Sequence, residues 1–230
     1  PVGKDSLSMR TVWHDVDGNP RRQVAPLSLI VSAFAPVRDV RGGVTPDLKP
    51  GKSSLLLVDL GQGRNRLGAS ALAQVYNQVG DTPPDADEPE LLRAFFDAVQ
   101  ELVASGLLLA YHDRSDGGAV VTLAEMAISG GRGVSVELPG KDTLAALFSE
   151  EAGVIIQVAN DKLEAVLEVV RRNGLGEVCG VIGKPTDNKE FSVLVQGKSV
   201  INTTLTNLRR TWSALTCRMQ TLRDNPVCAR

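Results

Sequence analysis

The sequence contains few cysteines and few histidines. Among its 230 residues there are three cysteines and two histidines. An odd number of cysteines without metal-ligand spacing argues against both a disulfide framework and a metal cluster. A structural role is the better interpretation for His14 and for His112, since neither histidine is placed to act as the base that a catalytic thiol needs. We therefore predict no catalytic nucleophile in this chain.

An excess of positive charge and long apolar runs are also missing. The formal net charge is −2, so the sequence offers no basic face to nucleic acid. Hydrophobic residues make up 43% and charged residues 23%, the usual mixture of a globular domain. No apolar run approaches the length that crosses a bilayer. We predict neither a nucleic acid nor a membrane as a partner.

The most informative segment is Tyr111–Gly118, which holds two carboxylates, a hydroxyl and a glycine pair. The apolar run Leu107–Ala110 before it predicts a strand buried on both faces. After it, Ala119–Ile128 is apolar nearly all round and predicts a helix that Gly130 and Gly131 close. The segment is thus predicted to be a tight loop between a strand and the N-terminus of a helix.

The residues alone leave two interpretations of this loop open. The free N–H groups of a helix start attract an anion, and Mg²⁺ between that anion and Asp113 or Asp116 would relieve the repulsion. Ser115 would then donate to a phosphate oxygen or a nucleotide hydroxyl. In the structural alternative, Asp116 is the helix N-cap, Ser115 is a turn residue and the glycines supply positive φ.

The remaining pattern predicts an α+β fold, in which a mixed β-sheet is layered with α-helices. Strands are expected at 53–60, 134–138, 153–158, 181–183 and 191–195, and helices within 67–79 and at 89–105, 143–148 and 163–173. The polar segment 185–189 suits a hairpin turn between the last two of these strands. The glycine pattern Gly61–Gly68 does not predict a dinucleotide site, because Arg66 occupies the third glycine position.

Three regions are predicted along the chain. Residues 1–42 form the end of a preceding domain and include an extended run at Leu27–Ala35. A linker rich in Gly and Pro follows at Arg41–Gly51. Residues 43–205 form the compact α+β domain. Residues 206–230 are helical, and we expect their apolar stripe to pack into the core; the stripe consists of Leu208, Trp212, Leu215, Met219 and Leu222.

Four segments resemble the large, glutamine-dependent phosphoribosylformylglycinamidine synthase of purine biosynthesis. They are Pro1–Met9, Leu55–Ser70, His112–Gly118 and Leu147–Gly153. The last three resemble the C-terminal domain of its second synthetase-like half, a domain also found in aminoimidazole ribonucleotide synthetase. The resemblance implies that residues 1–42 end an ATP-binding domain and that residues 206–230 lead toward a glutaminase domain. Because Pro1 lies inside a motif, we expect the chain to be a fragment.

The resemblance also implies a function. The family is cytoplasmic and uses ATP and glutamine-derived ammonia to convert formylglycinamide ribonucleotide to formylglycinamidine ribonucleotide. Asp113 would bind Mg²⁺ and Ser115 would contact ATP or ADP, while Arg64 and Arg66 would face a domain interface. The expected partners are the enzyme's other ATP-binding and glutaminase domains, so the isolated fragment is predicted to be inactive. An alternative is that this domain is a structural nucleotide-binding scaffold that does not turn over.

Overall fold

The computed structural model describes residues 10–24, 32–37, 39–224 and 228, and the chain separates into two units, Pro1–Arg38 and Asp39–Arg230. In the first unit, strands β1 (Arg10–His14) and β2 (Pro20–Val24) form an exposed antiparallel hairpin. The Asp15 carboxylate closes its turn by accepting the N–H groups of Asp17 and Asn19. The Pro1–Met9 motif lies outside the described residues, as does most of the predicted run Leu27–Ala35, whose described part forms no strand.

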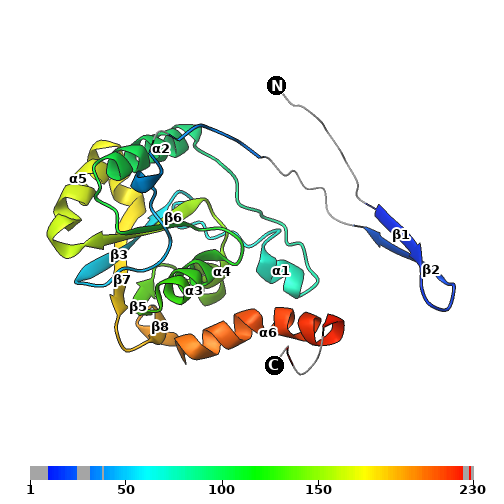
Figure 1. The fold of residues 1–230 in the computed structure, drawn as a ribbon. Coiled ribbons are helices and arrows are strands. Elements are labelled where there is room, and N and C mark those ends of the chain that lie inside the picture. The colour runs from blue at the N-terminus through cyan, green and yellow to red at the C-terminus, as the bar shows by residue number, and fades with distance from the viewer. Residues whose placement is uncertain (1–9, 25–31, 38, 225–227, 229–230) are drawn as a thin grey trace. The chain divides into compact units, whose positions relative to one another are not determined.

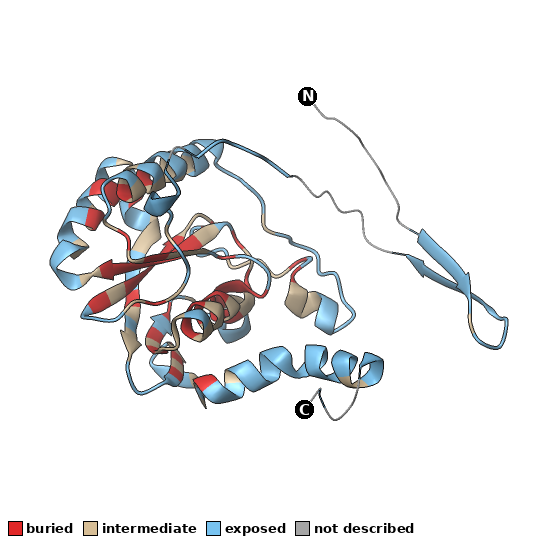
Figure 2. Cartoon of the chain, in the orientation of Figure 1, coloured by how far each residue is buried: buried red, intermediate tan, exposed pale blue. Residues whose placement is uncertain are grey.

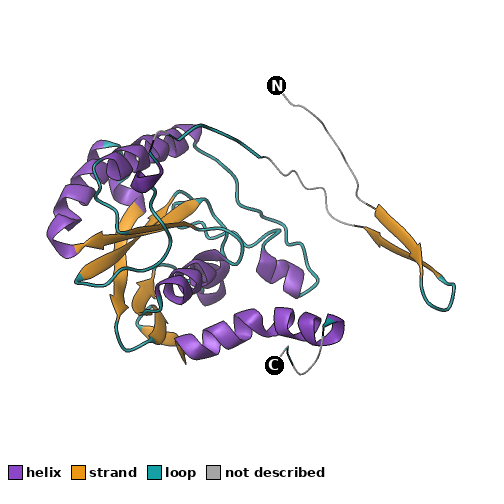
Figure 3. Ribbon diagram, viewed as in Figure 1, coloured by secondary structure: helices purple, strands orange, loops and turns teal. Residues whose placement is uncertain are grey.

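The second unit contains seven strands and six α-helices within its described residues (Figures 1 and 3). The strands are β3 (Ser53–Asp59), β4 (Ala110–Asp113), β5 (Gly133–Leu138), β6 (Gly153–Ala159), β7 (Cys179–Thr186), β8 (Glu190–Val195) and β9 (Lys198–Thr204). The helices are α1 (Ala71–Val75), α2 (Pro89–Ala104), α3 (Gly118–Gly130), α4 (Thr143–Phe148), α5 (Leu163–Arg172) and α6 (Leu205–Arg223). Short 3-10 helices lie at Val40–Gly42, Asn160–Lys162 and Gly176–Val178.

The seven strands form one mixed sheet in the order β4-β6-β3-β7-β5-β8-β9. The pairing of β5 with β8 is parallel, and the other neighbouring pairs are antiparallel. The α+β class with a mixed sheet is therefore confirmed. The predicted hairpin at 185–189 is wrong, because β5 lies between the two strands that this turn connects.

Helices cover both faces of the sheet, and strand alternation explains why. Successive side chains of a strand point to opposite faces. On β3, Leu55 and Leu57 therefore join the core beneath α3 and α4, while Leu56 and Val58 join the core beneath α2 and α5. Figure 2 shows this buried centre with exposed outer helix faces. A strand with helices on both sides is apolar at consecutive positions, as β3 is from Leu55 to Val58.

Two packing expectations are wrong. The predicted linker Arg41–Gly51 contributes to the domain, since Leu48 is buried and the Lys49 N–H donates to the side chain of Gln157. In α6, Leu208 packs partly against the core, but Trp212 is 69% exposed and the rest of the stripe is also exposed. Leu205, which the predicted helix did not include, is the buried residue of α6.

The three predicted domain boundaries stay a prediction.

Candidate functional site

The motif Tyr111–Gly118 begins inside β4, because this strand starts at Ala110, three residues later than predicted. Leu107–Leu109 precede the strand, while Tyr111, His112 and Asp113 belong to it. The side chains that follow alternate in burial: Asp113 and Ser115 are exposed, whereas Arg114 between them is buried. The loop therefore presents a carboxylate and a hydroxyl to solvent and sends a guanidinium inward.

The Asp113 carboxylate is oriented by its neighbours. The Tyr111 hydroxyl donates to Asp113 Oδ1 at 2.7 Å. Burial, together with this bond, raises the pKa of Tyr111 above its ordinary value, so the phenol stays a donor at neutral pH. The backbone carbonyl of Asp113 contacts Nδ1 of His112 at 2.8 Å and accepts the Thr122 hydroxyl at 3.3 Å. Nε2 of His112 in turn lies 3.0 Å from a carboxylate oxygen of Glu125. Both the side chain and the backbone of Asp113 are thus held in place.

The structural interpretation of Asp116 is wrong. The N-cap of α3 is Gly117, with φ of 83°, and no side chain caps the helix there. Gly118 follows with φ of 69°, and a Cβ on it would lie 2.6 Å from the backbone carbon of Phe148. The glycine pair is therefore needed both for its left-handed backbone and for the close approach of the C-terminal end of α4. Asp116 and Ser115 are exposed, and neither side chain hydrogen-bonds to a described residue.

The N-terminus of α3 already holds an acidic group. Glu150 Oε1 accepts the Gly117 N–H at 2.8 Å and also the Ala71 N–H at 2.8 Å. The Gly118 N–H donates to the carbonyl of Ser115. We expected these amides to be available for an anion, but two of them have protein acceptors. A negative charge from Glu150 occupies the position that the helix dipole favours.

A network of ion pairs joins the motif to two other segments. Arg114 donates to Asp59 Oδ1 at 2.5 Å and to the carbonyl of Glu151 at 2.6 Å. Glu151, which is 1% exposed, accepts two hydrogen bonds from the guanidinium of Arg66, at 2.7 and 2.8 Å. Burial alone would raise the pKa of Glu151, but the hydrogen bonds from Arg66 outweigh it and hold that pKa below its ordinary value. Arg66 also pairs with Asp87.

The expectation that Arg66 faces a domain interface is therefore wrong, because its side chain is only 12% exposed and is directed at Glu151 and Asp87 of the same unit. Arg64 also pairs with Asp87 but is more exposed, and its place at an interface stays a prediction. Sequence reasoning missed this network. The available signal was charge complementarity: the Leu55–Ser70 segment carries two arginines and the Leu147–Gly153 segment carries two glutamates, in stretches otherwise apolar enough to be buried, where unpaired charges are expensive.

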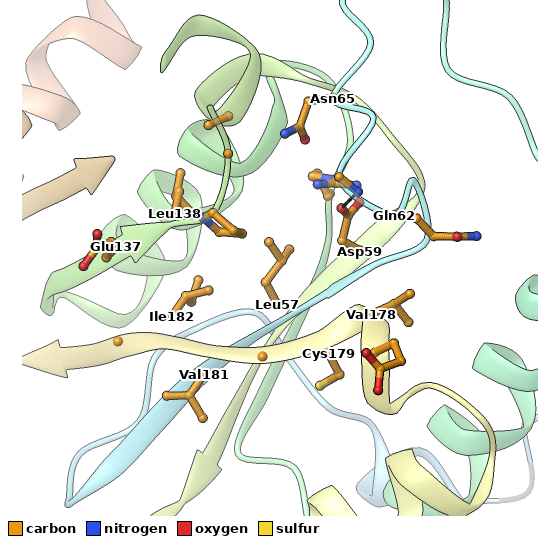
Figure 4. A pocket seen from close by; sticks show the side chains of 18 of the residues that line it. Leu57, Asp59, Gln62, Asn65, Glu137, Leu138, Val178, Cys179, Val181 and Ile182 are labelled. Atoms are coloured by element: carbon orange, nitrogen blue, oxygen red, sulfur yellow. Dashed lines mark hydrogen bonds and ion pairs between the residues drawn. The ribbon is translucent and has the colours of Figure 1, made fainter. Parts of the chain in front are cut away.

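A cavity of about 930 Å³ lies beside this network (Figure 4). β7 pairs with β3 through Cys179–Gly183 and then with β5 from Gly183 onward, so the ends of β3 and β5 diverge. Asp59 and Arg114 line the polar end of the gap, and Leu57, Leu138 and Ile182 line its apolar part. Burial raises the pKa of Cys179, another lining residue, to about 11, so this thiol stays protonated at neutral pH.

Asp113 and Ser115 suit Mg²⁺ only if another molecule supplies further oxygen ligands. Among the described residues, no three His, Cys, Asp or Glu side chains are grouped to hold a metal ion. Asp113 supplies one carboxylate, and Ser115 supplies one hydroxyl. Mg²⁺ is commonly held by one or two carboxylates when phosphate oxygens and water complete its octahedron. The residues therefore fit a metal that arrives with a nucleotide.

Two family models match the chain. Residues 52–196 match the model described as AIR synthase related protein, C-terminal domain, and residues 1–36 match the model described as FGAR-AT PurM_N-like domain. These matches confirm the resemblance predicted from the motifs. In the part of the chain that the structure describes, no helix is both long and apolar enough to cross a membrane.

Solved structures of Thermotoga maritima PurL share the fold. The ATP complex has a TM-score of 0.56 and 18% identity, and the match covers 74% of this chain and 27% of that one. The FGAR complex has a TM-score of 0.55 and 19% identity, covering 74% and 30%. PurLQS has a TM-score of 0.57 and 18% identity, covering 74% and 28%. The chain thus spans less than a third of the length of each of these chains.

Proposed function

We propose that this chain, which belongs to the AIR synthase related family through residues 52–196, forms part of an ATP-dependent amidotransferase of purine biosynthesis. The reaction consumes formylglycinamide ribonucleotide, ATP and glutamine-derived ammonia, and it yields formylglycinamidine ribonucleotide, ADP and phosphate. The remaining ATP-binding and glutaminase domains of a longer, cytoplasmic enzyme would be the partners.

The observation that carries the proposal is the pair of exposed side chains on either side of Arg114. Asp113 ends β4 and Ser115 lies in the loop after it, between the Asp59–Arg114 ion pair and the Gly117–Gly118 turn. The related PurL structures, solved in complex with ATP and with FGAR, support a nucleotide as the ligand.

The proposed roles follow from the chemistry of the two groups. Asp113 would bind Mg²⁺, which when present neutralises phosphate charge as the amide oxygen is phosphorylated. Ser115 would donate its hydroxyl to the nucleotide. Glu150 already accepts the Gly117 N–H at the start of α3, so the phosphates would be bound from the exposed side of the loop. We assign no catalytic residue in this chain.

Calorimetric titration of the 230-residue chain with ATP and Mg²⁺ tests these roles. Asp113→Asn should lose the Mg²⁺-dependent part of the affinity, and Ser115→Ala should weaken ATP binding about tenfold, as expected for a lost hydrogen bond to a charged group. Asp116→Asn is the matched control, since this exposed neighbour neither caps α3 nor bonds to a described residue. Equal affinities for wild type and Asp113→Asn would refute the metal role.

Activity separates a catalytic part from a structural scaffold. In the complete enzyme, Asp113→Asn should lower amidine formation sharply without lowering the melting temperature. If the melting temperature falls and amidine formation persists, the site is a structural nucleotide site instead. The 230-residue chain alone should form no amidine from ATP, ammonia and formylglycinamide ribonucleotide.

A further inference from the structure

The cavity lined by residues of β3, β5 and β7 is called the slot from here on. Its apolar part is formed by Leu57, Leu138 and Ile182, each less than 9% exposed. Gly180 lies on β7 two residues before Ile182 and therefore on the same face of the strand, and Figure 4 shows the side chains of Ile182 and Val181 on opposite sides of β7. A Cβ on Gly180 would meet no atom within 4 Å. The missing side chain at Gly180 thus leaves open space for a ligand.

Two polar groups at one end of the slot have unused hydrogen-bonding capacity. The Asn65 amide, which lines the same cavity as Asp59, makes no hydrogen bond with any described residue. Arg114 uses Nε and Nη2, but its Nη1 has no acceptor among the described residues, although the side chain is only 3% exposed. Asp59 is engaged by Arg114 and by the N–H groups of Gly61 and Gly63.

The charge of the slot opposes a phosphate. Among the described residues that line it, Arg114 is the one cation, and the carboxylate of Asp59 at 2.5 Å neutralises it. Glu137 and Glu177 also line the cavity, and neither forms an ion pair with a described residue. With two uncompensated carboxylates, the slot favours a neutral ligand over an anionic one.

We propose that this cavity binds an uncharged heteroaromatic ring of the nucleobase type, separately from the Mg²⁺ and nucleotide contacts assigned to Asp113 and Ser115. Its volume of about 930 Å³ lies within the range of small-molecule sites, which are mostly apolar with a few convergent polar groups. The ring stacks in the slot against Leu57 and Ile182. The Asn65 carboxamide pairs with a donor and an acceptor on the ring edge, as asparagine does with adenine, and Arg114 Nη1 donates to a second acceptor.

Titration of the 230-residue chain with adenosine, without metal, tests the proposal. We expect saturable binding of one adenosine per chain. Gly180→Leu fills the slot and should weaken binding at least tenfold, while circular dichroism confirms an unchanged fold. Gly42→Leu is the matched control, because a Cβ there also meets nothing within 4 Å and Gly42 does not line the cavity. Absence of saturable binding, or equal affinity in Gly180→Leu, overturns the proposal.

Two further variants keep the outcome clear. Asn65→Asp is nearly isosteric but removes the amide donor, so it should weaken adenosine binding about tenfold even if Gly180→Leu fails to fold. Asp113→Asn should leave adenosine affinity unchanged. If Asp113→Asn abolishes adenosine binding, the ring belongs to the Mg²⁺ and nucleotide site and the separate cavity site is wrong. If instead Asp113→Asn affects neither ligand, only the proposed metal role fails.

Discussion

At the scale of single residues, Glu151 connects the segments around the site. It accepts two hydrogen bonds from the Arg66 guanidinium while being almost fully buried. Removing one partner of a buried ion pair leaves the other charge uncompensated. We expect Glu151→Gln to lower the free energy of unfolding, measured in urea, by about 3 kcal/mol. The control Glu164→Gln breaks the exposed pair with Arg171 and should change it by less than about 0.5 kcal/mol.

The same carboxyl predicts a pH dependence. Because the pKa of Glu151 is below its ordinary value of 4.5 in the folded chain, its contribution to stability is present above pH 4.5 and is lost as the pH falls through the folded pKa. The stability difference between wild type and Glu151→Gln should therefore shrink on acidification below pH 4.5. A difference that stays constant down to the acid transition would contradict the assignment.

Tyr111 is the residue that orients the Asp113 carboxylate. Groups that hydrogen-bond to a metal ligand typically alter metal affinity 10- to 100-fold. Tyr111→Phe keeps the ring in place but removes the donor to Asp113 Oδ1. We expect Mg²⁺-dependent ATP affinity to fall about tenfold in titration calorimetry. Tyr76→Phe, at a tyrosine that is 69% exposed, should have no effect, and equal losses in both variants would rule out this role.

At the scale of elements, much of the secondary structure could be predicted because the local signals are strong. Pro89 begins α2 and Gly131 ends α3 with φ of 62°, as the sequence indicated. The site was harder to predict, since Asp113 is in β4 and not in the loop. Leu107–Leu109 lie before the strand, and this run is apolar because Leu107 and Leu108 pack into the core beneath α2 and α5. The N-cap of α3 is Gly117, and the carboxylate that accepts its N–H comes from Glu150, 33 residues away. Such a distant partner leaves no local pattern.

Helix α6 shows how periodicity can mislead. Its stripe has the spacing of a core helix, yet Trp212 and Leu222 are 69% and 88% exposed, whereas Leu205 is 4% exposed. We expect Leu205→Ala to destabilise the chain by about 2 to 4 kcal/mol, because it empties a packed site. Trp212→Ala should change the free energy of unfolding by less than about 0.5 kcal/mol in the same urea titration. A large loss in Trp212→Ala would show that the exposed face is covered in solution.

At the scale of the whole molecule, the sheet could be predicted as mixed but not in its order. Segment 185–189 has hairpin chemistry, yet β5 comes between β7 and β8 because β5 supplies Val134, Val136 and Leu138 to the core under α3. Gly183, where a Cβ would lie 2.1 Å from the Ser135 carbonyl oxygen, permits this close approach of β5 to β7. The same change of partner on β7 separates the ends of β3 and β5 and creates the cavity.

The strand order predicts which part of the chain opens last. Amide exchange is slowest where hydrogen-bonded strands are covered on both faces. β3 and β6 have buried centres, Leu55–Val58 and Val154–Val158, with a paired strand on each side. β9 is an edge strand with no buried residue. In hydrogen–deuterium exchange followed by mass spectrometry, peptides from β3 and β6 should therefore exchange only on global unfolding, while β9 exchanges earlier. Equal protection of β9 would mean that its edge is covered by a further contact, since an open strand edge has amides that water reaches directly.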